Sequence, residues 1–227
     1  MGDDSIRLRS DVSVRLVQHF GSDASVVAAA RVSVEGAESA RHLGADAASG
    51  LIRYLVRQRH GTPFEHAGMT FVVEAPIFVF REWHRHRAGW GYNETSGRYR
   101  ELEPVFWVPP PDRKVKPAPG FKPARPEFVG GDECDHELIQ SECAAAYRRA
   151  WDSYRAMLAA GVAREVARAV LPVGTYSSMY ATCNPRSLMH FLSLRTGDAG
   201  ASYPQAEIER ADRKSTRLNS SHSDRAR

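Results

Sequence analysis

The sequence predicts one α+β domain in which a mostly antiparallel sheet is flanked by helices. The chain has 227 residues, a length that suits a single domain with a substantial core. Its hydrophobic content of 42% and charged content of 26% are ordinary for a globular protein. Segments with the two-residue alternation of strands are interspersed with segments whose apolar residues recur at helical spacing.

Strand patterns occur at four places along the chain. Alternation and β-branched or aromatic residues predict strands over Ser13–Phe20, Met69–Glu74, Glu103–Val108 and Thr175–Thr182. The stretch Pro109–Gly131 is rich in Pro, Gly and Lys, which indicates an irregular surface excursion.

Helical spacing of apolar residues predicts six helices, over Asp23–Ser33, Ser39–His60, Ile77–Arg85, Glu133–Ala160, Ala163–Leu171 and Arg186–Leu194. Their bounds follow from capping and breaking residues. Asp23 can cap the first helix, and Gly61-Thr62-Pro63 ends the second. Pro76 suits the first turn of the third, Pro172 stops the fifth, and Asn184-Pro185 opens the last. The third helix would deliver Arg85 and its neighbours to a pocket at its C-terminal end.

The formal charge of +4 does not indicate a general polyanion binder. Residues 211–227 hold five Lys or Arg and two Asp, a net of +3, so the other residues carry only about +1. A body this close to neutral argues against nucleic acid as a partner. Any role of the arginines in binding must therefore depend on their positions and not on their number.

Neither a membrane nor a secreted location is expected. No apolar run is long enough to span a bilayer, and the polar N-terminus MGDDSIRLRS lacks the apolar stretch of a signal peptide. The three cysteines, Cys134, Cys143 and Cys183, are scattered and do not form Cys-x-x-Cys pairs. This pattern argues against a disulfide framework or a cysteine zinc site and fits the reducing cytoplasm.

The stretch Arg81–Tyr99, REWHRHRAGWGYNETSGRY, has few aliphatic side chains to bury and many hydrogen-bond donors to satisfy. It combines clustered arginines and histidines with three glycines. Arginine's planar fork suits phosphate, and glycine lets backbone N–H groups approach a ligand closely. The stretch therefore indicates a site for bound anions, with a solvated basic loop as the alternative.

Four blocks in order resemble the flavin-dependent thymidylate synthases. Arg85-His86-Arg87 followed by Asn93-Glu94-Thr95-Ser96-Gly97-Arg98-Tyr99 is similar to the signature of that family. Eight residues separate Arg87 from Ser96, one more than the family's seven, and the extra residue falls within Ala88–Tyr92. The other blocks are Ala30–Ser33, Phe64–His66 with Ala75–Phe78, and Ala163–Pro172 with Asn184–Arg195. Together the blocks cover roughly Ser13–Glu209.

The resemblance also sets the expected domain bounds. Residues 1–210 would form the catalytic domain, with the fold of this family. After Ala206–Glu209 the family continues with another helix, whereas this chain becomes polar and without periodicity. Residues 211–227 are therefore expected to be a non-native, disordered tail, and a native C-terminal helix is expected to be missing.

The resemblance implies reductive methylation of dUMP to dTMP on FAD. Methylenetetrahydrofolate would supply the carbon and NADPH the hydride, in a cytoplasmic homotetramer whose active sites several subunits share. A phosphate monoester requires a fixed cationic clamp. The positions that match the family's nucleotide contacts are Glu82, Arg85, Glu94, Ser96, Gly97, Arg98, Arg168 and Arg195. Alone, Arg168 could be an exposed helix residue and Arg195 a charge favoured by a helix dipole.

FAD brings a pyrophosphate and a ring that becomes anionic on reduction, so positive groups near the ring would stabilise it. The positions that match flavin contacts are Ser33, His66, Arg85, His86, Arg87, Asn93, Glu94, Asn184, Arg186 and His190. His190 stands where the family usually has Asn, and it could titrate near neutral pH. No G-x-G-x-x-G fingerprint is present, so a Rossmann module is not expected.

The catalytic residues implied are Ser96, Arg168 and Arg195. No cysteine lies in a setting that would clearly lower its pKa, and Ser96 has no recognisable histidine-acid relay. Ser96 is therefore expected to orient and polarise the nucleotide, without a cysteine nucleophile.

The same residues leave two alternative functions open. A metal enzyme could use His60, His66, His84 and His86, although the adjacent arginines oppose a dication, and no metal is expected. An RNA-binding module could stack bases on Trp83, Trp90 and Tyr92.

Overall fold

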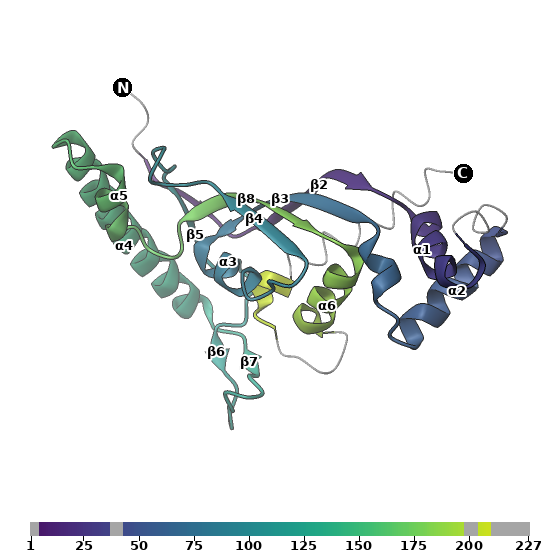
Figure 1. Cartoon of the computed structure of the whole chain (residues 1–227). Helices are drawn as coiled ribbons and strands as arrows, with labels where there is room; N and C mark the ends of the chain where they lie inside the picture. Colours follow the sequence, from purple (N-terminus) through teal and green to yellow (C-terminus); the bar gives the residue numbers. More distant parts are fainter. Residues whose placement is uncertain (1–4, 37–42, 198–203, 210–227) are drawn as a thin grey trace.

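The computed structural model describes residues 5–36, 43–197 and 204–209 (Figure 1). Its centre is a four-stranded sheet in the order β2–β3–β8–β4, and each neighbouring pair is antiparallel. The strands are β2 (Ser13–Phe20), β3 (Gly68–Pro76), β4 (Trp90–Glu94) and β8 (Tyr176–Cys183). The predicted mostly antiparallel α+β domain is confirmed.

One face of this sheet carries the main core. Alternating residues of β3 and β8 are buried, among them Val73, Ala75 and Ala181, each 0% exposed. Helices α3 (Ile77–Trp83) and α6 (Pro185–Arg195) pack on this face, as Figure 1 shows. Residues 206–209 form a short helical turn between them, and its Ile208, 0% exposed, joins the core beside Trp83 and Phe191.

A second core lies under the longest helix, α4 (Glu133–Ala159). It packs Phe106 of β5 (Val105–Trp107) against Tyr147, Trp151 and Tyr154. The Tyr147 hydroxyl donates to the Trp107 carbonyl at 2.8 Å. Two short segments follow α4: α5 (Arg164–Ala167) and the 3-10 turn η3 (Arg168–Val170). This unit therefore holds the Arg168 region at one end of the molecule.

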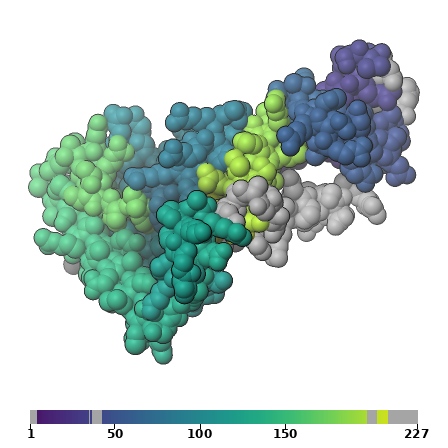
Figure 2. All heavy atoms as spheres, turned by 90° about the horizontal axis from the view of Figure 1, so that it is seen from below, coloured from purple at the N-terminus to yellow at the C-terminus, as the bar shows by residue number. Residues whose placement is uncertain are grey.

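Helices α1 (Asp23–Glu35) and α2 (Ala45–Arg57) form a third, smaller core with the 3-10 turn η2 (Thr62–Glu65). Val26, Leu55 and Phe64 are its buried residues. Figures 1 and 2 place this unit at the opposite end of an elongated molecule from α4, with α6 between them.

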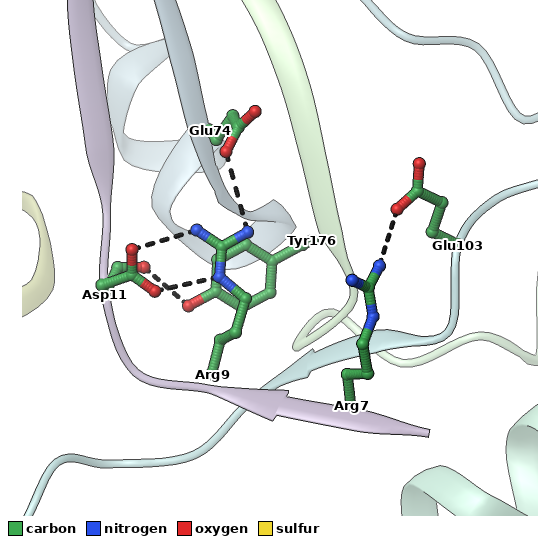
Figure 3. A network of polar contacts seen from close by, with 6 residues as sticks. All are labelled: Arg7, Arg9, Asp11, Glu74, Glu103 and Tyr176. Atoms are coloured by element: carbon green, nitrogen blue, oxygen red, sulfur yellow. Dashed lines mark hydrogen bonds and ion pairs between the residues drawn. The ribbon is translucent and has the colours of Figure 1, made fainter. Parts of the chain in front are cut away.

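Strand β1 (Arg7–Arg9) pairs in parallel with β5 and is tied to the central sheet by Arg9 (Figure 3). The Arg9 guanidinium donates two hydrogen bonds to the Asp11 carboxylate, at 2.9 and 3.0 Å, and lies 4.7 Å from the centre of the Tyr176 ring. The Tyr176 hydroxyl donates to the Asp11 carbonyl at 2.6 Å. A short hairpin of β6 (Lys116–Pro117) and β7 (Phe128–Val129) gives the predicted irregular excursion some regular structure.

The predicted strands match well, and four helices need correction. The bounds of β2 agree with the prediction, and α4 ends one residue earlier. The second helix begins at Ala45 and ends at Arg57, because Gly44 is its N-cap and the chain leaves helical geometry at Arg59, φ 58°. The first helix is capped by Ser22, and Asp23 is its first residue.

The third and fifth predicted helices are shorter than expected. Helix α3 ends at Trp83, so Arg85 lies beyond it. The fifth becomes a 3-10 turn from Arg168, which breaks the helical repeat before Pro172. Strands β1 and β4 were not predicted.

The expected disordered tail at residues 211–227 lies outside the described residues, so it stays a prediction. Within the described ranges, no helix is long and apolar enough to cross a membrane.

Candidate active site

Arg195 is the best-held arginine of the predicted site. It is the last residue of α6 and faces the end of α3. Its Nη1 donates to the Glu82 carboxylate at 2.9 Å, its Nη2 to the Glu82 carbonyl at 3.4 Å, and its Nε to Nε2 of His86 at 3.0 Å. The side chains of Arg195 and Glu82 are only 20% and 24% exposed. We refer to Arg195, Glu82 and His86 as the Arg195 cluster.

His86 is neutral in this arrangement. It is 8% exposed, and burial, with help from Arg195 and His190, lowers its pKa to about 4. Because Arg195 donates to Nε2, that nitrogen must be the acceptor and Nδ1 must carry the proton. His86 therefore acts as a neutral hydrogen-bond acceptor that fixes one edge of the guanidinium.

Burial raises the pKa of Glu82, against the lowering effect of Arg195, and the nearby carboxylate of Glu207 raises it further. An ionised Glu82 accepts from Arg195 with one oxygen and holds the other side of the guanidinium through its carbonyl. Arginine has five N–H groups, and three are used here. One N–H on each terminal nitrogen of Arg195 is therefore left for a ligand.

A second group surrounds the turn after β4. Gly97 is buried, and a Cβ on it would lie 3.2 Å from Cδ of Arg168, so the turn packs against that side chain. The Arg98 amide donates to Ser96 Oγ at 3.3 Å, and its guanidinium reaches Glu165 at 3.2 Å. Both side chains of the Arg98–Glu165 pair are about half exposed, at 47% and 59%. We call Ser96, Gly97, Arg98, Glu165 and Arg168 the Ser96 cluster.

A third group lies where α6 begins. Asn184 caps α6, with its Oδ1 accepting from the Ser187 amide at 2.8 Å. Arg186 forms an ion pair with Glu65, and His66 is exposed beside it at the end of η2. We call Glu65, His66, Asn184 and Arg186 the Arg186 cluster.

The turn between His86 and β4 requires glycine. Gly89 has φ 69°, and a Cβ there would lie 2.2 Å from Ser187 Oγ, which donates to the Ala88 carbonyl at 2.9 Å. This contact brings the Arg-His-Arg segment against the start of α6. The extra residue relative to the family signature falls in this same stretch, Ala88–Tyr92.

The chain brings the predicted residues into these three clusters and not into one. No hydrogen bond or ion pair given by the described residues links the Arg195 cluster to the Ser96 cluster. The positions matched to nucleotide therefore divide, with Glu82 and Arg195 in one cluster and Ser96, Gly97, Arg98 and Arg168 in the other. The remaining predicted residues are exposed, apart from the half-buried Glu94: Ser33, Arg85, Arg87, Asn93 and His190.

Two features of the site were missed from the sequence. The Tyr92 hydroxyl lies 2.7 Å from the His86 carbonyl and 3.1 Å from the Trp83 carbonyl, so β4 fixes the backbone around His86. The other is an ion pair between Arg113 and Glu207, at 2.8 Å. The alternation of Trp90-Gly91-Tyr92-Asn93-Glu94 could have revealed β4 and hence the first contact. Only the folded chain brings Arg113 to Glu207.

The two alternative functions lose their structural basis. Trp83 is 2% exposed in the main core, and Trp90 and Tyr92 stack on each other against that core, so they form no open platform for bases. In the part of the chain that the structure describes, no group of three or more His, Cys, Asp or Glu residues could hold a metal ion. Burial raises the pKa of Cys183 to about 12, so this thiol is not an activated nucleophile.

Comparisons with known proteins agree on one family. A family model described as "Thymidylate synthase complementing protein" matches residues 15–217. The flavin-dependent thymidylate synthase of Streptomyces coelicolor is 57% identical over 217 residues, covering 93% of this chain and 87% of that protein. The enzyme of the same name from Tropheryma whipplei is 48% identical over 204 residues, covering 88% and 84%.

Solved structures of the same kind are similar over nearly the whole chain. The UMP/dUMP methylase PolB from Streptomyces cacaoi, bound with 5-Br dUMP, has a TM-score of 0.84 and 49% identity, covering 92% of this chain and 90% of that one. The same enzyme bound with 5-Br UMP has a TM-score of 0.80 and 50% identity, covering 92% and 88%.

Proposed function

The chain belongs to the family of flavin-dependent thymidylate synthases, and from this we propose that it methylates dUMP to dTMP with FAD as its flavin, methylenetetrahydrofolate as carbon donor and NADPH as reductant. The observation that carries the proposal is the preformed Arg195 cluster. Its two remaining N–H groups, one on each terminal nitrogen, suit the carbonyl or phosphate oxygens of a nucleotide.

The chain's own residues would bind and polarise the nucleotide. Arg195 would donate hydrogen bonds from a half-buried position, where the low dielectric strengthens its effect on developing negative charge. Arg168 and Arg98 would supply positive charge from the Ser96 cluster. Ser96 Oγ would orient the substrate: it accepts from the Arg98 amide, and no base among the described residues is placed to activate it.

Several exposed groups fit a flavin with its pyrophosphate. Arg85 and Arg87 flank the buried His86 and leave both guanidiniums exposed, and Arg186 and His66 add further polar groups. Arginine forks suit pyrophosphate and can stabilise a reduced, anionic ring. When bound, FAD would carry hydride from the reductant to the nucleotide. Asn93, Asn184, His190 and Ser33 complete the proposed flavin contacts.

We also propose a homotetramer whose active sites are shared between subunits. The separation of the nucleotide-matching residues into the Arg195 cluster and the Ser96 cluster supports it, because one nucleotide needs both. The three cysteines are free, which suits an enzyme of the cytoplasm, and neither nucleic acid nor a membrane is proposed as a partner.

Mixing two impaired variants tests the shared site. Arg195→Ala and Arg168→Ala each remove one half of the proposed nucleotide site. If the halves come from different subunits, unfolding and refolding the two variants together should raise dTMP formation well above that of either variant alone. No recovery, in mixed oligomers shown by mass spectrometry to contain both variants, would place the whole site within one chain.

The function itself is tested by the visible absorption spectrum of the purified protein under anaerobic conditions. A bound flavin that bleaches with NADPH and whose spectrum changes with dUMP supports the proposal, as does dTMP formed once methylenetetrahydrofolate is added. UMP is offered in parallel, because the similar PolB structures are bound with analogues of both nucleotides. A folded protein that binds no added FAD, or that binds it and makes no dTMP, overturns the proposal.

A further inference from the structure

Glu207 has a buried carboxylate and is not among the residues proposed to contact the nucleotide or the flavin. It is 3% exposed and lies in the short turn of residues 206–209, next to Ile208 in the main core. Its Oε1 accepts from Arg113 at 2.8 Å. Among the described residues its Oε2 is buried and has no hydrogen-bond donor. A half-satisfied buried carboxylate is costly, which calls for a reason beyond packing.

Arg113 reaches Glu207 from the excursion that carries β6 and β7. Its side chain is 17% exposed, its Nη1 donates to the Lys114 carbonyl at 2.7 Å, and its guanidinium lies 5.4 Å from the centre of the Phe128 ring. The arginine is therefore held independently of Glu207, and the pair fixes the turn of residues 206–209 against the excursion.

This pair lies beside the Arg195 cluster. Arg113, Glu82 and Arg195 line one cavity of about 760 Å³, together with Ala206, which precedes Glu207. The Gly197 amide, two residues after Arg195, donates to Glu209 at 3.4 Å, so the same turn also closes on the end of α6. Arg113, Glu82 and Arg195 thus share this wall, and Arg113 connects it to the buried Glu207.

We propose that Glu207 is a positioning residue of the nucleotide site, whose buried charge sets how firmly Glu82 holds Arg195. The inference rests on the proposed function. The Glu82 side chain holds Arg195 most firmly while it is ionised, and a nearby second carboxylate disfavours that form. The raised pKa of Glu82, to which Glu207 contributes after burial, agrees with this arrangement.

Other charges also face Glu82 and enter the prediction. Arg195 favours its ionised form, while His86, whose pKa is lowered to about 4, is neutral between pH 5 and pH 8. The remaining charged groups on the cavity wall are Arg113, Arg125 and Glu209. Protonation of Glu82 as the pH falls would weaken one of the three hydrogen bonds that hold Arg195, and so weaken nucleotide binding.

Glu207→Gln tests the proposal through the pH dependence of nucleotide affinity. The Kd of dUMP is measured by the change in flavin absorbance of the FAD-loaded protein between pH 5 and pH 8. Without the charge of Glu207, Glu82 ionises more easily. The acid limb of the profile, where affinity falls with falling pH, should therefore move toward lower pH, and binding at the acid end should become tighter. A residue that only stabilises the fold would not improve binding in acid.

Two further variants keep the result interpretable. Glu127→Gln makes the same change in net charge at an exposed position on the neighbouring cavity wall, and it should leave the acid limb in place. Arg113→Lys keeps the charge opposite Glu207 and should also leave it in place. An acid limb that does not move in Glu207→Gln, or that moves equally in Glu127→Gln, overturns the proposal. Wild-type protein that binds no dUMP would instead contradict the proposed function.

Discussion

The Arg195 cluster and the Ser96 cluster hold their arginines in different ways. Arg195 is 20% exposed and is fixed by three hydrogen bonds that it donates to two residues of its own chain. Arg98 has a half-exposed partner, Glu165, and Arg168 rests on Gly97 through the apolar part of its side chain. The difference teaches that one half of the proposed site is preorganised before a ligand arrives, whereas the other half would gain much of its order from the ligand.

Arg195→Ala should give the largest effect, because it removes a preorganised donor and leaves Glu82 half-buried without its partner. We expect kcat/KM for dTMP formation to fall on the order of 10²–10³-fold. Arg195→Lys keeps the charge but loses the planar fork, so it should restore only part of the rate. A loss smaller than tenfold in Arg195→Ala would remove this residue from the catalytic group.

Arg168→Ala and Ser96→Ala should reduce dTMP formation strongly, though less than Arg195→Ala. We expect losses of about 10-fold to 100-fold, because each removes a charged or polar contact that the ligand itself must organise. Circular dichroism should show an unchanged fold, since Arg168 and Ser96 are only partly buried. Near-wild-type turnover in both variants would mean that the Ser96 cluster does not contact the nucleotide.

The buried His86 should make stability depend on pH. Its pKa is about 4 in the folded chain and about 6.5 when unfolded, so its stabilising effect is complete above pH 6.5 and is lost as the pH falls toward 4. The loss is on the order of 2 to 3 kcal/mol. His86→Gln keeps an acceptor for Arg195 without a titrating group. Urea unfolding at pH 7 and pH 4, at one protein concentration, should show a smaller acid loss in the variant than in the wild type.

Glu165→Gln should have the smallest effect. The Arg98–Glu165 pair is exposed and screened by salt, so it contributes at most about 1 kcal/mol. We expect less than a fivefold change in the KM for dUMP and no change in the melting temperature beyond about 2 °C. A large loss of activity would show that Glu165 holds Arg98 for the ligand, which would make the two clusters more alike than their geometry indicates.

Much of the fold could be predicted from the sequence because periodicity and capping are local. Ser13–Phe20 alternates along its length, and Asp132 caps the long helix that begins at Glu133. Errors arose where two adjacent residues offer the same signal, as Ser22 and Asp23 do for a helix cap. The strand Trp90–Glu94 was missed because its glycine and its charged neighbours, which are typical of a loop, outweighed its alternation, and pairing with β8 makes it a strand.

The sequence can nominate candidate site residues but not their arrangement. The family motifs name Glu82, Ser96, Arg168 and Arg195. They do not show that a neutral His86 accepts a hydrogen bond from Arg195, because that depends on burial, which sequence spacing does not give. Arg113 and Glu207 lie outside every motif, and their pairing depends on tertiary contacts alone.

The burial of Ile208 in the main core also affects how the chain folds during translation. The core gathers Val12 and Val14 from near the start of the chain and Ile208 from near the end of its described part. Val12 leaves the ribosome long before Ile208 is synthesised. The core of the nascent sheet therefore lacks Ile208 during most of synthesis. Contacts so distant in sequence slow folding and expose apolar surface meanwhile. Newly made chains should therefore depend on chaperones until residues 206–209 have emerged.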